Sequence, residues 1–168
     1  LLCQHGPNSG CNTCGACVRA SRLEHPDLHL LFPFRNKPES NEGEWFDELQ
    51  RHRELLAGGP YPTVMYEKGR VIVKYLMSEV QERLMESSLE GGRRVCVIIG
   101  ADRLNPTTGN RLLKILEEPP EGVHFILTAE RLSTVLPTIV SRSSVIRFRR
   151  LRVPEIAAYL ERYPELSP

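Results

Sequence analysis

The sequence of 168 residues has no long hydrophobic run and no surplus of either charge. Its longest apolar runs are about five residues, whereas a membrane-spanning helix needs roughly 20. With 22 Lys and Arg against 21 Asp and Glu, the net charge of +1 favours neither a nucleic-acid nor a membrane partner. The N-terminal residues lack the basic and apolar regions of a secretion signal. These absences predict a protein of a reducing compartment with no membrane partner.

Cysteine, in contrast, is concentrated at one end of the chain. Four of the five cysteines lie within the first 17 residues, at Cys3, Cys11, Cys14 and Cys17. Such crowding without an export signal favours metal thiolates over disulfides. Two overlapping Cys-x2-Cys pairs share Cys14 and Cys3 closes the set, so the four predict one tetrahedral, structural Zn²⁺ site. Four free thiols, or His5 in place of Cys3 as a ligand, are the alternatives, and Cys96 is expected in the core.

The remaining sequence predicts a layered α/β domain with a parallel sheet, because apolar strand patterns alternate with helical ones. We expect strands at 28–32, 95–99, 123–127 and 145–148. We expect helices at 74–88, 110–116 and 154–163, a short helix within 35–62, and a turn or short helix at 132–141 broken at Pro137. No internal repeat or low-complexity tract accompanies them.

Two segments carry a specific pattern. Residues 110–120 read N-R-L-L-K-I-L-E-E-P-P, and residues 138–143 read T-I-V-S-R-S. They closely resemble the bacterial DNA polymerase III clamp-loader family, whose AAA+ subunits carry L-L-K-x-L-E-E-P-P and T-I-x-S-R-C. The cysteine cluster resembles the zinc module inserted in that domain, and residues 25–27 match the His-Pro-Asp run that follows it.

The resemblance implies an AAA+, P-loop-NTPase-like, three-layer α/β fold. A zinc knuckle at 1–19 would be inserted in the AAA+ domain, whose remainder would occupy 20–150, and a lid or linker helix would begin at 151–168. The sequence contains no P-loop, G-x4-G-K-[ST], and begins where family members are already past it. We therefore expect the first strand and that loop upstream.

ATP hydrolysis in this family also needs an acidic pair at the end of a later core strand, to hold Mg²⁺ and orient water. The matching positions are Ile99 and Gly100, whose side chains cannot bind magnesium, and Asp102 lies too late. The sensor position similarly falls on Ala129, with Thr128 one residue early. These departures resemble the delta-prime branch of the family, which is ATP-inert, better than the gamma/tau motor branch.

Arg142, in the Ser141-Arg142 pair, is the strongest candidate for a functional residue. A guanidinium is planar and always charged, and the resemblance implies an arginine finger supplied in trans to a neighbouring ATPase subunit. Ser143 replaces the cysteine usual in the family. From charge alone, Arg142 would simply belong to a solvated basic face with the arginines at 147, 149, 150 and 152. Residues 131–153 contain no acid, so contact with nucleic-acid phosphates is a further interpretation.

The resemblance thus implies a non-catalytic stator subunit in the bacterial cytoplasm, with structural Zn²⁺ as its cofactor. Its implied partners are gamma/tau-type motor subunits, a delta-type subunit and, through the complex, the sliding clamp and primer–template DNA. An ATP-hydrolysing gamma/tau-type motor and a zinc-dependent nucleic-acid-binding module are the alternatives. Glu117 and Glu118 precede two prolines and are interpreted as the end of a helix rather than an acid–base pair.

Overall fold

The computed structural model describes residues 1–6, 10–35, 50–51, 54, 70–72, 74–90 and 92–162. The elements, in chain order, are α1 (Gly15–Ser21), β1 (Leu28–Leu31), β2 (Phe34–Arg35), β3 (Arg70–Val71), α3 (Lys74–Met85), β4 (Arg94–Ile98), the 3-10 helix η2 (Ala101–Arg103), α4 (Pro106–Glu117), β5 (Val123–Leu127), the 3-10 helix η3 (Leu132–Thr134), α5 (Pro137–Val140) and α6 (Val153–Arg162). The short helix expected within 35–62 lies almost entirely outside the described residues. Across the described ranges, no helix is long and apolar enough to cross a membrane.

A parallel sheet of three strands, in the order β1-β4-β5, lies at the centre of the fold. Leu28 pairs with Val95, and Arg94 pairs with Val123. Because β4 lies between the other two strands, four of its five residues are buried. The parallel α/β arrangement predicted from alternating strand and helix patterns is therefore confirmed.

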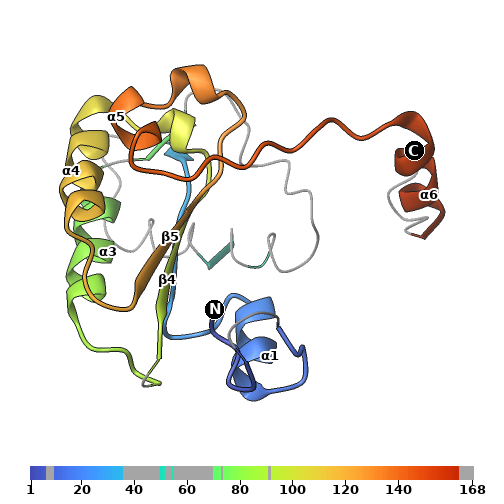
Figure 1. Cartoon of the computed structure of the whole chain (residues 1–168), viewed down its shortest axis with the longest axis horizontal. Coiled ribbons are helices and arrows are strands. Elements are labelled where there is room, and N and C mark those ends of the chain that lie inside the picture. The colour runs from blue at the N-terminus through green and yellow to red at the C-terminus, as the bar shows by residue number, and fades with distance from the viewer. Residues whose placement is uncertain are drawn as a thin grey trace.

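Helices α3 and α4 lie side by side along one face of this sheet (Figure 1). Their buried side chains join those of the strands in one core, which includes Leu31, Phe32, Met77, Leu84, Cys96, Ile98, Leu112 and Ile115. Burying a side chain of this size contributes about 1.5–3 kcal/mol. Cys96 is fully buried, as expected, and burial raises the pKa of its thiol to about 12. The second helical layer implied by the family resemblance stays a prediction.

Helix α3 ends at Met85, three residues before the end expected from the sequence. The buried guanidinium of Arg94 accounts for this end, because it donates hydrogen bonds to the carbonyls of Leu84 and Glu86. The same side chain reaches the Glu121 carbonyl at 2.8 Å, in the turn before β5. A charged residue therefore begins the central strand because it satisfies carbonyl groups from two neighbouring segments.

Helix α4 begins at Pro106, four residues before the expected start. Asn105 caps it, since its side-chain oxygen accepts a hydrogen bond of 2.8 Å from the Thr108 amide, and Pro106 occupies the first turn. Gly109 lies in this first turn of α4. A methyl group at this position would overlap Leu136 Cδ1. The first turn of α4 thus packs directly against the chain that leads into α5.

The strand expected at 145–148 does not form, and that prediction was wrong. No residue of this segment pairs with the sheet as the structure describes it, and Ile146 and Phe148 are 78% and 91% exposed. The segment borders a hollow of about 430 Å³ that separates it from Leu127 and Ile139. Its β-branched and aromatic pattern favours a strand only where a neighbouring strand can pair with it. The chain instead runs extended from α5 to α6 (Figure 1).

Candidate functional sites: a cysteine cluster and an exposed arginine

The four N-terminal cysteines come together in one cluster, with their sulfur atoms within 4.8 Å of one another. The Sγ atoms of Cys11 and Cys17 lie 3.9 Å apart, close to the edge of about 3.8 Å in a tetrahedron with 2.3 Å metal–sulfur bonds. Asn12 makes the turn after Cys11 possible by adopting a left-handed conformation with φ of 59°. The grouping predicted from spacing alone is therefore present in the fold.

Backbone amides support the cluster. The amide of Cys14 donates to Cys11 Sγ at 3.3 Å, and the amide of Cys17 donates to Cys14 Sγ at 3.4 Å. The second bond also caps α1, because Cys14 is its N-cap residue. Four sulfurs that converge within 4.8 Å of one another fit a closed structural Zn²⁺ site, which leaves no open position for water.

The thiols of the cluster titrate at different pH values. The Thr13 hydroxyl and then nearby backbone amides lower the pKa of Cys11 to about 5. A backbone hydrogen bond acts to lower the pKa of Cys17, but partial burial and three neighbouring thiols together raise it to about 11. At neutral pH the cluster therefore offers at least one thiolate to a cation, while the crowding of sulfurs opposes further ionisation.

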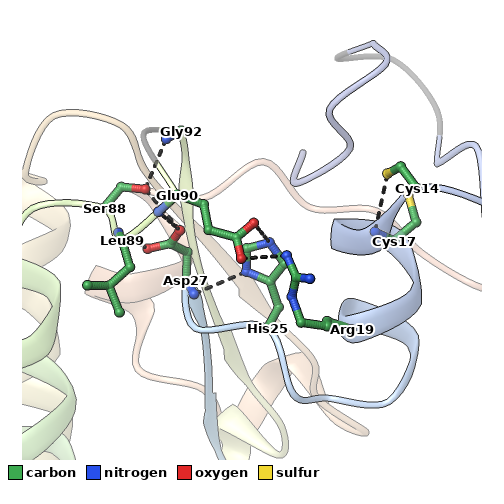
Figure 2. A network of polar contacts seen from close by, with 9 residues as sticks. All are labelled: Cys14, Cys17, Arg19, His25, Asp27, Ser88, Leu89, Glu90 and Gly92. Carbon is green, nitrogen blue, oxygen red and sulfur yellow. Dashed lines mark hydrogen bonds and ion pairs between the residues drawn. The ribbon is translucent and has the colours of Figure 1, made fainter.

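A polar network joins the cysteine module, which consists of the cysteine cluster and α1, to the α/β body (Figure 2). The Glu90 carboxylate forms an ion pair with Arg19 of α1, and its Oε2 lies 3.4 Å from Nε2 of His25. Nδ1 of His25 accepts a hydrogen bond of 3.1 Å from the Asp27 amide. Both ring nitrogens of this buried histidine are thus engaged, so His25 links two parts of the fold.

Asp27 organises the other half of the network. Its carboxylate accepts hydrogen bonds from the Ser88 hydroxyl at 2.9 Å, the Leu89 amide at 3.0 Å and the Glu90 amide at 3.2 Å. Burial acts to raise the pKa of Asp27, but these bonds outweigh it and hold the pKa below its usual value. Sequence reasoning matched 25–27 to a family run without assigning it a role, because the partners lie some 60 positions away.

The end of β4 carries no acidic side chain. Beyond the strand, the Ile99 amide still donates to the Leu31 carbonyl at 2.7 Å, and Gly100 adopts a left-handed conformation with φ of 72°. A Cβ atom at Gly100 would lie 3.1 Å from Pro33 Cγ. The Gly100 amide donates to the Thr128 hydroxyl at 3.2 Å, so that hydroxyl joins the ends of β4 and β5.

Asp102 follows this strand end in sequence, and it lies within η2 rather than on the strand. Its Oδ1 atom is buried and has no hydrogen-bond partner among the described residues. A cavity of about 90 Å³ lies beside the joined ends of β4 and β5, lined in part by Gly100, Asp102 and Thr128. Glu130 also lines this cavity, but neither it nor Asp102 belongs to β4, which ends at Ile98.

Arg142 follows α5 and lies at the surface, with its side chain 37% exposed. Its Nη2 atom lies 2.7 Å from Oε1 of Glu117, the last residue of α4. Its Nη1 atom donates to the Thr138 carbonyl at 3.1 Å and approaches the Ser141 hydroxyl at 3.4 Å. The sequence interpretation of Glu117 as the end of a helix missed this ion pair, because it depends on the packing of α4 against α5.

Two other arginines of the basic segment 142–152 have different surroundings. Arg149 and Arg152 form ion pairs with Glu155 at the start of α6. The hydrogen bond from Arg149 is the main reason why the pKa of Glu155 falls to about 2. Arg142 therefore differs from these residues by lying beside the central domain rather than on the extended segment.

Comparison with known proteins finds relatives that are subunits of DNA polymerase III. Residues 1–152 match the sequence family described as DNA polymerase III, delta subunit. The DNA polymerase III subunit delta' of Bacillus subtilis is 27% identical over 152 residues, covering 90% of this chain and 36% of that protein. The subunit delta' of Haemophilus influenzae is 26% identical over 145 residues, covering 86% and 34%. The chain thus spans about a third of the length of these curated relatives.

Two further similarities concern the gamma branch. The DNA polymerase III subunit gamma/tau of Mycobacterium tuberculosis is 36% identical over 87 residues, covering 52% of this chain and 15% of that protein. Among solved structures, a DNA polymerase III gamma subunit-related protein from Thermotoga maritima has a TM-score of 0.50 at 21% identity, covering 84% of this chain and 37% of that one. This structural similarity supports the α/β fold alone.

Proposed function

The chain belongs to the DNA polymerase III delta subunit family, and we propose that it acts as the delta-prime subunit of a bacterial replicative clamp loader. In this proposal it works in the bacterial cytoplasm, with gamma/tau-type motor subunits and a delta-type subunit. It holds the geometry of the motor ring and hydrolyses no ATP itself. Through the assembly it helps to load the sliding clamp at primer–template DNA.

The backbone at Gly100 is the observation that carries the non-catalytic half of this proposal. Magnesium binding at the end of β4 would need carboxylates on the strand terminus. At Gly100 a left-handed backbone and the approach of Pro33 both oppose any side chain. Ile99 and Gly100 are therefore degenerate positions of the acidic pair, and replacing one residue would not restore it.

Arg142 provides the contribution to catalysis in a neighbour. It is exposed at the end of a short helix and stands next to Ser141, as in the family's Ser-Arg motif. A guanidinium supplied in trans stabilises charge on the transferring γ-phosphoryl and raises turnover by about 10³–10⁵-fold. In this proposal Arg142 is that arginine finger, while the Arg149 and Arg152 side chains form ion pairs with Glu155 at the start of α6.

The cysteine module is structural in this proposal. Zn²⁺ held by Cys3, Cys11, Cys14 and Cys17 orders the knuckle at 1–19, which is inserted in an AAA+ domain whose remainder spans 20–150. Residues 151–168 begin the lid or linker. The Arg19–Glu90–His25 network supports a fixed attachment of the knuckle to the domain.

A gamma/tau-type motor subunit is the second candidate, and the 36% identity to the mycobacterial gamma/tau protein favours it. The two candidates differ in whether the full-length chain turns over ATP by itself. Turnover of about 1 per second or more by the isolated full-length chain would support the motor. Background rates are expected from the delta-prime assignment.

The experiment that tests the finger uses a clamp loader reconstituted from full-length subunits. With Arg142→Ala, we expect normal assembly and zinc content but ATP turnover reduced by about 10³-fold if one site limits the rate, and by less if the sites fire independently. Arg142→Lys restores only part of the rate, because an ammonium group lacks the planar fork. Arg150→Ala, at an exposed arginine of the same segment, is the matched control. Equal turnover of wild-type and Arg142→Ala loaders assembled to the same extent would refute the role.

A further inference from the structure

The guanidinium of Arg142 is docked against its own chain through both terminal nitrogens. Nη2 binds the Glu117 carboxylate at 2.7 Å, and Nη1 donates to the Thr138 carbonyl at 3.1 Å. The edge formed by these two nitrogens is one that a guanidinium offers to a phosphate in two parallel hydrogen bonds. In this conformation that edge faces oxygen atoms of the chain itself.

The positions of the two residues are set by helix packing. Glu117 ends α4. Helix α5 ends at Val140, and Arg142 follows two positions later, directly after the C-cap residue Ser141. The chain entering α5 touches α4 so closely that a methyl group at Gly109 would overlap Leu136 Cδ1. The ion pair therefore joins two docked helices and does not depend on a long loop.

The restraint is weak enough to be reversible. The side chains of Arg142 and Glu117 are 37% and 50% exposed, so solvent screens their attraction. Exposed pairs of this kind shift an equilibrium about 1.4- to 5-fold, which corresponds to about 0.2–1 kcal/mol. A phosphate that offers more negative charge and two acceptor oxygens can replace the single carboxylate oxygen.

We propose that Glu117 is a positioning residue that holds Arg142 in a parked conformation, from which the finger is released when a neighbour's ATP phosphate replaces the carboxylate. This inference rests on the proposed function of Arg142 as a finger. Glu117 thereby sets the fraction of subunits whose guanidinium is free before the neighbouring site engages it. Removing the charge of Glu117 increases that fraction and leaves the positive charge of Arg142 unchanged.

The parked conformation is tested in the full-length chain without ATP. Phenylglyoxal modifies accessible guanidinium groups, and the rate at Arg142 is followed by peptide mass spectrometry. Glu117→Gln is expected to raise that rate about 1.4- to 5-fold. Glu118→Gln, which removes the adjacent exposed carboxylate, should leave it at the wild-type value. The gain should shrink at about 0.5 M salt, because salt screens exposed pairs, and equal rates in all three proteins would overturn the proposal.

The consequence for the finger is tested in the reconstituted loader at subsaturating ATP. Glu117→Gln should raise turnover about 1.4- to 5-fold over wild type and over Glu118→Gln. Combined with Arg142→Ala, it should change nothing further, because it acts through that arginine. Reduced turnover of the Glu117→Gln loader would show that Glu117 aims the finger instead of parking it, and would overturn the proposal. Unchanged turnover of Glu117→Gln would also overturn it, provided that Arg142→Ala slows the loader. If Arg142→Ala itself has no effect, the proposed finger fails together with this inference, whatever the modification rates show.

Discussion

Replacing Asp27 with alanine should weaken the junction between the cysteine module and the α/β body. Asp27 is 3% exposed, and its carboxylate accepts hydrogen bonds from Ser88, Leu89 and Glu90. Without it, two backbone amides lose their acceptor at about 1–2 kcal/mol each. The Ser88 hydroxyl also loses the acceptor of its proton, although its oxygen still accepts from the Gly92 amide. We therefore expect Asp27→Ala to lower the free energy of unfolding by about 2–4 kcal/mol.

The same bonds give this residue a defined pH dependence. They hold the pKa of Asp27 below its usual value, so the folded protein binds this proton less readily than the unfolded chain. The resulting stability is present above the unfolded pKa of about 4 and is lost as the pH falls through the folded pKa. Asp27→Asn lacks this charge, so its stability should fall less steeply than that of wild type below about pH 4.

Urea unfolding of the full-length chain between pH 7 and pH 3 measures both effects. Hydrogen exchange locates them, since protection should fall at the amides of Leu89 and Glu90. Glu24→Gln is the control, because it removes an exposed carboxylate three positions away. An Asp27→Ala protein within about 0.5 kcal/mol of wild type, with both amides still protected, would refute the reasoning.

Two further predictions concern the metal and the strand end. Purified, reduced protein should carry about one equivalent of zinc, and chelation should raise hydrogen exchange within residues 1–21 while the sheet stays protected; metal-free protein, or loss of the whole fold on chelation, would contradict the closed thiolate site. Gly100→Asp should give no ATP turnover and should cost about 1–2 kcal/mol of stability, because it forces a side chain into a left-handed backbone beside Pro33. Turnover gained by this single change would argue against the degenerate acidic pair.

The parts of the fold that the sequence predicts best are those governed by local hydrophobic pattern. The apolar runs of β1, β4 and β5 and the periodicity of α3 locate these elements to within three residues, and Val123–Leu127 is matched in full. The cysteine cluster was equally predictable from the sequence, because short spacing constrains where four thiols can lie. Features that depend on distant packing were missed.

Three cases show the physical reason. The start of α4 was missed because Thr107, Thr108 and Gly109 are poor helix formers, and its early start reflects the Asn105 cap and contact with the chain before α5. The segment 145–148 has strand composition, but no strand among the described residues pairs with it. The ion pair between Glu117 and Arg142 joins residues 25 positions apart, so only the docking of α4 on α5 brings them together.

The most direct test of the account is the structure of a clamp loader assembled from full-length subunits with ADP and beryllofluoride, a mimic of the γ-phosphoryl group. The account predicts that Arg142 has left Glu117 and donates hydrogen bonds to the beryllofluoride in the neighbouring motor subunit. It also predicts that the end of β4 at Gly100 holds no magnesium. A magnesium ion bound there, or an Arg142 still paired with Glu117 while another arginine contacts the beryllofluoride, would contradict it.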